Sequence, residues 1–179
     1  MGLRNRKLFD NQDNTYFITS SVLGLRKVFS IHETYYNILI ESLYFTRKKY
    51  TSYIIAYVLM PNHIHVILTM NNGKSISDYM RDFKRHTSKE IVKLLKKDKK
   101  DKLLQDLYKL GGTGNYRLWK DRFDDLIITN EKTLKIKIDY IHNNPVEAGL
   151  VENITDWKYS SARNYYLDDD SVFTVDRVF

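Results

Sequence analysis

The chain has 179 residues, of which 42% are apolar and 28% are charged, a composition that is typical of one globular domain over residues 1–179 and not of a disordered chain. It contains no cysteine, which excludes disulfides, thiol nucleophiles and zinc–thiolate sites and favours a cytoplasmic protein. Its net charge of +7 favours an anionic partner, nucleic acid first, and no apolar run is long enough to predict a membrane span.

Seven segments carry strand or helix signals. β-branched, aromatic or continuous apolar residues mark the strands, and apolar residues spaced by three or four positions mark the helices. The predicted order is strand, helix, strand, strand, helix, strand, helix, over residues 15–22, 32–49, 52–60, 63–70, 75–97, 123–129 and 131–143. This order predicts an α+β, ferredoxin-like antiparallel sheet with helices on one or both faces and an added C-terminal helix.

The connections between these segments carry signals of their own. Pro61-Asn62 is a turn signal that makes the two central strands a hairpin. Residues 96–102 and 111–115 are expected to form a mobile connection, and Pro145 is expected to close the last helix. The aromatic residues that follow position 157 predict that the first part of the tail packs on the domain.

Two histidines follow the turn signal, one residue apart in a predicted strand. Because side chains of a strand alternate between its faces, His63 and His65 project to the same face, about 7 Å apart. Two imidazoles at this spacing can converge on one divalent cation. The alternative is a pair of hydrogen-bonded histidines on a sheet surface, and the spacing alone does not separate the two interpretations.

A tyrosine and an asparagine share one face of the last predicted helix, since positions 140 and 144 are one turn apart. In a functional interpretation, Tyr140 stands beside an amide that reaches the same metal. In the structural alternative, Tyr140 is a core aromatic residue and Asn144 ends the helix before Pro145. The chain has 14 tyrosines, so spacing alone favours the structural alternative.

Five segments, taken together and in this order, resemble the motifs of the REP-associated tyrosine transposases, a branch of the HUH single-tyrosine transposase superfamily. The segments are Pro61-Asn62-His63-Ile64-His65, Met80-Arg81-Asp82-Phe83-Lys84, Trp119-Lys120-Asp121-Arg122-Phe123, Tyr140-Ile141-His142-Asn143-Asn144-Pro145-Val146 and Trp157-Lys158-Tyr159-Ser160-Ser161. The first is similar to the family's H-U-H motif, in which U is a bulky apolar residue. The resemblance covers most of the chain.

The resemblance implies a metal-dependent enzyme that nicks single-stranded DNA and transfers strands. His63 and His65 would be ligands of Mg²⁺ or Mn²⁺, with Asn144 as the third protein ligand and His142 as its rival. Tyr140 would attack a phosphodiester, leaving a 5′-phosphotyrosine and a free 3′-hydroxyl, while the metal neutralises charge on the phosphate. The implied partner is single-stranded DNA with hairpins, bound by a monomer or a homodimer.

Basic residues supply candidate contacts to the DNA. Between positions 81 and 102 there are ten lysines and arginines against four acidic residues. Four of the ten fall near one side of the predicted helix and are candidate phosphate contacts, namely Arg81, Lys84, Arg85 and Lys89. Trp119 and Arg122 are candidates for stacking on unpaired bases. The alternative for each basic residue is a solvated helix face.

Two other functions remain open at the level of the sequence. One is a catalytically silent nucleic-acid-binding protein of the same fold. The other is a metal-dependent hydrolase that uses the His-x-His pair on a small molecule, in which Tyr140→Phe would keep much of the activity.

Overall fold

The computed structural model describes residues 14–71, 73–112 and 114–178. Its helices and strands follow the predicted order, with two α-helices and two short 3-10 helices (Leu23–Leu25 and Phe29–Ile31) in addition. The strands and α-helices are β1 (Asn14–Ser21), α1 (Glu33–Tyr50), β2 (Tyr53–Leu59), β3 (His63–Met70), α2 (Ile76–Lys97), α3 (Asp101–Gly111), β4 (Asp124–Ile128), α4 (Glu131–Glu147) and α5 (Ala162–Leu167).

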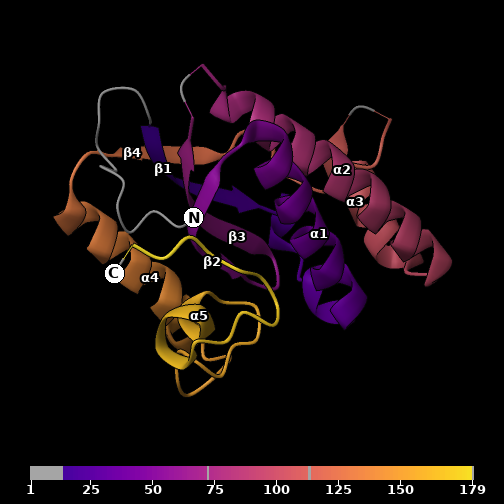
Figure 1. Ribbon diagram of the computed structural model, residues 1–179. Coiled ribbons are helices and arrows are strands. Elements are labelled where there is room, and N and C mark those ends of the chain that lie inside the picture. The colour runs from indigo at the N-terminus through magenta and orange to yellow at the C-terminus, as the bar shows by residue number, and fades with distance from the viewer. Residues whose placement is uncertain (1–13, 72, 113, 179) are drawn as a thin grey trace.

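The strands form an antiparallel sheet in the order β2-β3-β1-β4 (Figure 1). β3 lies between β1 and β2 and pairs with both, and β4 extends the sheet on the other side of β1. This is the strand order of a ferredoxin-like sheet, so the predicted α+β fold is confirmed. The register places Thr19 opposite His65 and Ser21 opposite His63.

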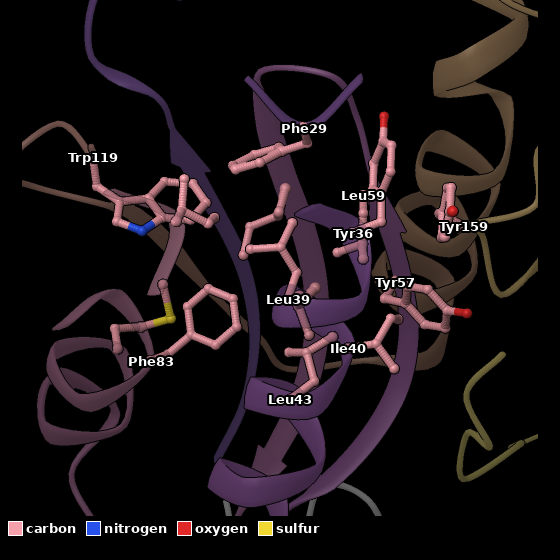
Figure 2. Packing of buried hydrophobic residues seen from close by; sticks show 14 of the residues in the cluster. Phe29, Tyr36, Leu39, Ile40, Leu43, Tyr57, Leu59, Phe83, Trp119 and Tyr159 are labelled. Atoms are coloured by element: carbon pink, nitrogen blue, oxygen red, sulfur yellow. The ribbon is translucent and has the colours of Figure 1, made fainter. Parts of the chain in front are cut away.

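Helices cover both faces of the sheet, with α1 and α2 on one face and α4 on the other (Figure 1). The larger core cluster lies under α1 and α2 and includes Leu39 and Phe83 (Figure 2). The smaller cluster lies under α4. Ile64 and Val66 of β3 belong to the larger cluster. Because neighbouring strand residues face opposite sides, His63 and His65 project toward the face that α4 covers.

The helix α4 is capped at its N-terminus by Asn130 and extends beyond Asn143, its predicted last residue. Asn130 Oδ1 accepts a hydrogen bond from the backbone N–H of Thr133 at 2.8 Å. The prediction that Pro145 closes the helix is wrong, because α4 continues to Glu147. Proline in the last turn removes only one helical donor, and the carbonyl oxygen of Asn144 still accepts from the backbone N–H of Ala148 at 3.0 Å. Asn144 is therefore helical, one turn after Tyr140.

The helix α3 begins within the first and ends within the second of the two segments, residues 96–102 and 111–115, for which the sequence predicts a mobile connection, and no helix is predicted there. Leu104 and Leu107, which are three residues apart, are buried against the larger cluster. The predicted helix over 32–49 is confirmed as α1 (Glu33–Tyr50). Before β4, Trp119 forms an isolated antiparallel bridge to Val22.

The segment after α4 lies along the outer edge of β2, as the aromatic residues of the tail predict. The backbone N–H of Leu59 donates to the carbonyl oxygen of Tyr159 at 2.9 Å, and the N–H of Asp176 donates to that of Ile54 at 2.8 Å. These hydrogen bonds pair backbone N–H and C=O groups of the edge strand β2 that would otherwise be exposed. In the part of the chain that the structure describes, no helix is both long and apolar enough to cross a lipid bilayer.

Candidate active site

The two histidines of β3 form a close pair. Their ring centroids are 4.8 Å apart, and the two rings are nearly perpendicular, at 76°. His65 is 4% exposed, and His63 is partly buried. The expectation that both side chains lie on one face of the strand is confirmed.

Each imidazole is held through its Nδ1 atom. Asn62 Oδ1 lies 2.7 Å from His63 Nδ1, and Thr19 Oγ1 lies 2.8 Å from His65 Nδ1. Asn62 can only accept through this oxygen, so His63 carries its proton on Nδ1 and keeps the lone pair on Nε2. The Nε2 atom of His65 is buried and has no hydrogen-bond partner among the described residues. Ligand histidines of metal sites are oriented in this way, with one nitrogen fixed and the other free.

Burial keeps both imidazoles neutral at neutral pH. It lowers the pKa of His63, an effect that a hydrogen bond accepted by the Asn144 side chain opposes. Burial, followed by repulsion from a protonated His63 and from the Lys137 ammonium, lowers the pKa of His65 to about 3. A neutral imidazole offers its lone pair to a cation, whereas a protonated one repels it.

The helix α4 places Tyr140 beside the pair. The Tyr140 ring centroid is 5.2 Å from that of His65 and 5.9 Å from that of Phe17, with edge-on geometry in both cases. Phe17 in turn stacks on His65, with centroids 5.5 Å apart. Tyr140 is 39% exposed, so it is not a core aromatic residue and a substrate can reach it. The structure thus brings together the tyrosine and the two histidines that the sequence singled out.

Asn144 and His142 lie on different sides of α4. Asn144 is near enough to His63 for a hydrogen bond to influence its pKa. His142 is 1% exposed, and its Nε2 atom is 2.9 Å from Ser161 Oγ, in the segment that follows α4. Its ring also packs against Tyr165, with centroids 5.3 Å apart. His142 therefore faces the C-terminal segment and not the histidine pair, and the assignment of Asn144 as the third ligand stays a prediction.

The helix α2, which carries the predicted phosphate contacts, lies on the face of the sheet opposite to α4 (Figure 1). The histidine pair projects toward the α4 face. Arg81 is exposed and pairs with Asp78 at 2.5 Å. Arg85 is exposed and pairs with Asp82 at 3.1 Å. Arg81 can exchange its solvent-exposed ion pair for phosphate at little cost. The partner of Arg85, Asp82, is buried and also accepts hydrogen bonds from Lys49 and Tyr50, so it keeps partners when Arg85 turns toward phosphate.

The two lysines of this group differ from each other. Lys84 is partly buried, and its Nζ atom donates to the backbone carbonyl oxygens of Lys120 and Asp121 at 2.6 and 3.0 Å. Lys84 therefore holds the segment before β4 in place, a role that the sequence did not reveal. Lys89 is exposed and makes no ion pair among the described residues.

A basic groove of about 580 Å³ runs beside the C-terminal half of α2. Its charged lining residues are all basic, and an exposed aromatic ring contributes one wall; the lining residues are Arg85, Ser88, Lys89, Val92, Lys93, Lys96, Asn115 and Tyr116. A groove of this composition suits a nucleic-acid backbone.

The prediction that Trp119 stacks on unpaired bases is wrong. Trp119 is 2% exposed, and its Nε1 donates to Thr87 Oγ1 at 2.9 Å. Its ring packs against Phe29 and Phe83, with centroids 5.4 and 6.0 Å apart (Figure 2). Trp119 is therefore a core residue, and its sequence motif does not indicate this burial. Arg122 is exposed, and its contact with DNA stays a prediction.

Three residues of this region were not found from the sequence. Thr19 and Phe17 lie on β1, and their place beside His65 depends on the register between β1 and β3. Lys137 lies one turn before Tyr140, a spacing that a helical wheel shows but that carries no motif.

The donor set fits one divalent cation. Two neutral imidazoles and one amide oxygen are acceptable ligands for Mn²⁺ or Mg²⁺ when phosphate oxygens and water complete the coordination. In the described part of the chain, no third histidine or carboxylate joins the pair to form a protein-only site. The buried Nε2 of His65 without a partner is the observation that calls for such an ion, because an unsatisfied buried polar atom is costly.

Comparison with known proteins agrees with this geometry. Residues 24–144, which include the histidine pair and Tyr140, match the family described as "Transposase IS200 like". A Haemophilus influenzae protein provisionally named a REP-associated tyrosine transposase is 31% identical over 121 residues, which is 65% of this chain and 62% of that protein. The REP-associated tyrosine transposase of Escherichia coli K12 is 25% identical over 148 residues, which is 82% of this chain and 75% of that protein.

A solved structure has a similar fold. The structure of a REP-associated tyrosine transposase bound to a REP hairpin superimposes with a TM-score of 0.65 and 22% identity, covering 94% of this chain and 87% of that one. The predicted resemblance is confirmed by these matches. The chain belongs to the IS200-like transposase family, and the two relatives described above carry the name REP-associated tyrosine transposase, one of them provisionally.

Proposed function

We propose that this protein is a metal-dependent endonuclease and transposase that cleaves and rejoins hairpin-associated single-stranded DNA through a phosphotyrosine at Tyr140. The observation that carries the proposal is the exposed Tyr140 ring 5.2 Å from the ring of His65, whose Nε2 is buried without a partner. The similar structure bound to a REP hairpin supports a hairpin as the partner.

Each residue of the site has a role in this reaction. His63 and His65 would hold Mg²⁺ or Mn²⁺ through their Nε2 atoms, and Asn144 through its amide oxygen. When bound, the cation supplies positive charge to the phosphate oxygens. Asn62 and Thr19 keep the two imidazoles in the orientation that leaves Nε2 free.

The chemical step is an in-line displacement at phosphorus. The Oη atom of Tyr140 forms a bond to phosphorus as the bond between phosphorus and the 3′ oxygen breaks. The phenolic proton passes to solvent, and the departing 3′ oxygen takes up a proton from solvent. The downstream strand stays attached to Tyr140 through its 5′ phosphate. Because the number of phosphodiester bonds is unchanged, a 3′-hydroxyl can reverse the step and join strands without another energy source.

End-labelled hairpin strands test this proposal. With Mn²⁺, a 3′-labelled strand should give a covalent protein–DNA band on a denaturing gel, and a 5′-labelled strand should give a shorter free fragment. Tyr140→Phe should abolish both products. Tyr166→Phe, at an exposed tyrosine of α5, is the matched control and should cleave as the wild type does.

The alternatives predict other patterns. Hairpin binding by the wild type without any cleavage would favour a catalytically silent binding protein of the same fold. Metal-dependent hydrolysis of a small ester that survives Tyr140→Phe would favour a hydrolase built on the histidine pair.

A further inference from the structure

Lys137 lies on α4, one turn before Tyr140 and on the same side of the helix. Its Nζ atom is 4.7 Å from the centroid of the Phe17 ring and 5.6 Å from that of Tyr140. Phe17 stacks on His65. The lysine ammonium therefore lies at the rim of the site that Tyr140 and the histidine pair form.

The positive charge of Lys137 has no counter-ion among the described residues. Other basic side chains of the structure, such as Lys49, Arg85 and Arg163, each pair with a carboxylate. Lys137 is partly buried and makes only cation–π contacts, which hold the ammonium in place without neutralising it. An anion that enters the site would therefore gain a strong partner in Lys137.

Lys137 is also near enough to the histidine pair for its charge to be felt there. After burial and the effect of His63, this charge is the third cause that lowers the pKa of His65. A cation held by the two histidines would repel the ammonium unless an anion lay between them. A phosphodiester is such an anion, and its nonbridging oxygens gain negative charge as a nucleophile attacks.

We propose that the ammonium group of Lys137 binds a nonbridging oxygen of the scissile phosphate and stabilises the charge that this oxygen gains during attack by Tyr140. The inference rests on the proposed function and adds a second source of positive charge to it. The lysine keeps its protons throughout, and the bonds made and broken are those of the displacement at phosphorus. Lys137 is thus a catalytic residue of both cleavage and rejoining.

Three variants test the assignment through the single-turnover rate of covalent adduct formation, at saturating Mn²⁺ and DNA. Lys137→Ala should lower the rate on the order of 100-fold, as loss of one transition-state donor does. Lys137→Arg keeps the charge and should recover much of the rate. Lys135→Ala, the matched control, removes the same charge from an exposed position of α4 and should react at the wild-type rate.

A substrate with a methylphosphonate at the scissile position separates a contact to phosphate from a structural role. Replacement of the nonbridging oxygen by a methyl group removes the negative charge that Lys137 would contact. The wild type and Lys137→Ala should then differ by less than about twofold in rate, so the effect of the variant should vanish on this substrate.

Three outcomes would overturn the inference. They are a Lys137→Ala rate equal to that of the wild type on the normal substrate, an equal loss on both substrates, and an equal loss in Lys135→Ala. In each of them the wild type still forms the adduct, so the proposed function would stand. Absence of the adduct in the wild type would instead contradict the proposed function itself.

Discussion

The ring of His65 on β3 and the ring of Tyr140 on α4 lie edge to face, with centroids 5.2 Å apart and planes at 72°. The two residues are far apart in the chain and meet because α4 crosses the face of the sheet toward which His65 points. The contact joins a candidate nucleophile to a candidate metal ligand.

Loss of the Thr19 hydroxyl should weaken metal binding. Thr19 Oγ1 holds Nδ1 of His65 at 2.8 Å, so Thr19→Val should raise the dissociation constant for Mn²⁺ by about 10- to 100-fold, because the ring loses its orienting partner. Isothermal titration calorimetry with Mn²⁺ measures this dissociation constant. Thr15→Val makes the same change on the same strand at a hydroxyl bonded to Thr69, and it should leave metal affinity unchanged. Equal affinities in the two variants would contradict the orienting role.

Two adjacent asparagines offer a matched test of the third ligand. Asn144→Ala should weaken Mn²⁺ binding and raise the metal concentration needed for cleavage, because the amide near His63 is lost. Asn143 is exposed and only donates to the carbonyl oxygen of Asp139, so Asn143→Ala should bind metal as the wild type does. A normal metal titration of Asn144→Ala would show that this residue is not a ligand.

Stability should fall in mild acid because of His142. Burial lowers its pKa from 6.5 to about 4, so between these pH values the unfolded chain binds a proton that the folded chain does not. Above pH 6.5 both states are neutral and the group contributes nothing to the pH dependence. Each such proton costs about 1.4 kcal/mol of unfolding free energy per pH unit.

Urea unfolding at a series of pH values measures this loss. His142→Gln should show a shallower fall than the wild type between pH 6.5 and 4, with the slope that remains due to His65 and the acidic groups. A slope that does not change in His142→Gln would contradict the assignment of this buried neutral histidine.

Variants at Trp119 and Lys89 should affect different properties, the first the stability of the fold and the second the affinity for DNA. Trp119→Ala should lower the unfolding free energy by about 3–5 kcal/mol, because it empties a core position, and should leave DNA affinity of the folded protein unchanged. Lys89→Ala should leave stability nearly unchanged and should lower DNA affinity. The slope of the logarithm of the binding constant against the logarithm of salt concentration should fall by about one, as expected for the loss of one phosphate contact. The reverse pattern, measured by unfolding and by fluorescence anisotropy, would contradict both placements.

The sequence predicts the fold well because its strands are strongly marked. The predicted strand over 63–70 coincides with β3, since a continuous apolar run ends there and a turn signal precedes it. The helix α3 escaped prediction because lysines and aspartates surround Leu104 and Leu107 and obscure their helical spacing. The length of α4 escaped it as well, because a proline in the last turn does not end a helix.

The sequence predicts the histidine pair of the site but not the residues that surround it. Histidines at alternate positions of a strand must share a face, so the pair follows from the sequence. The position of Thr19 and Phe17 depends on strand register, which needs long-range pairing. The face of the sheet that each helix covers is also a tertiary property, so the sequence could not show that α2 lies across the sheet from α4.

Mass spectrometry of the covalent adduct tests the central claim most directly. Trypsin should release the peptide of residues 138–158, in which Tyr140 is the only tyrosine. After reaction with a hairpin strand and Mn²⁺ and digestion of the DNA, this peptide should carry a nucleotide linked through its 5′ phosphate to Tyr140. A nucleotide on any other tyrosine peptide, or cleavage products without a protein-linked nucleotide, would contradict the account.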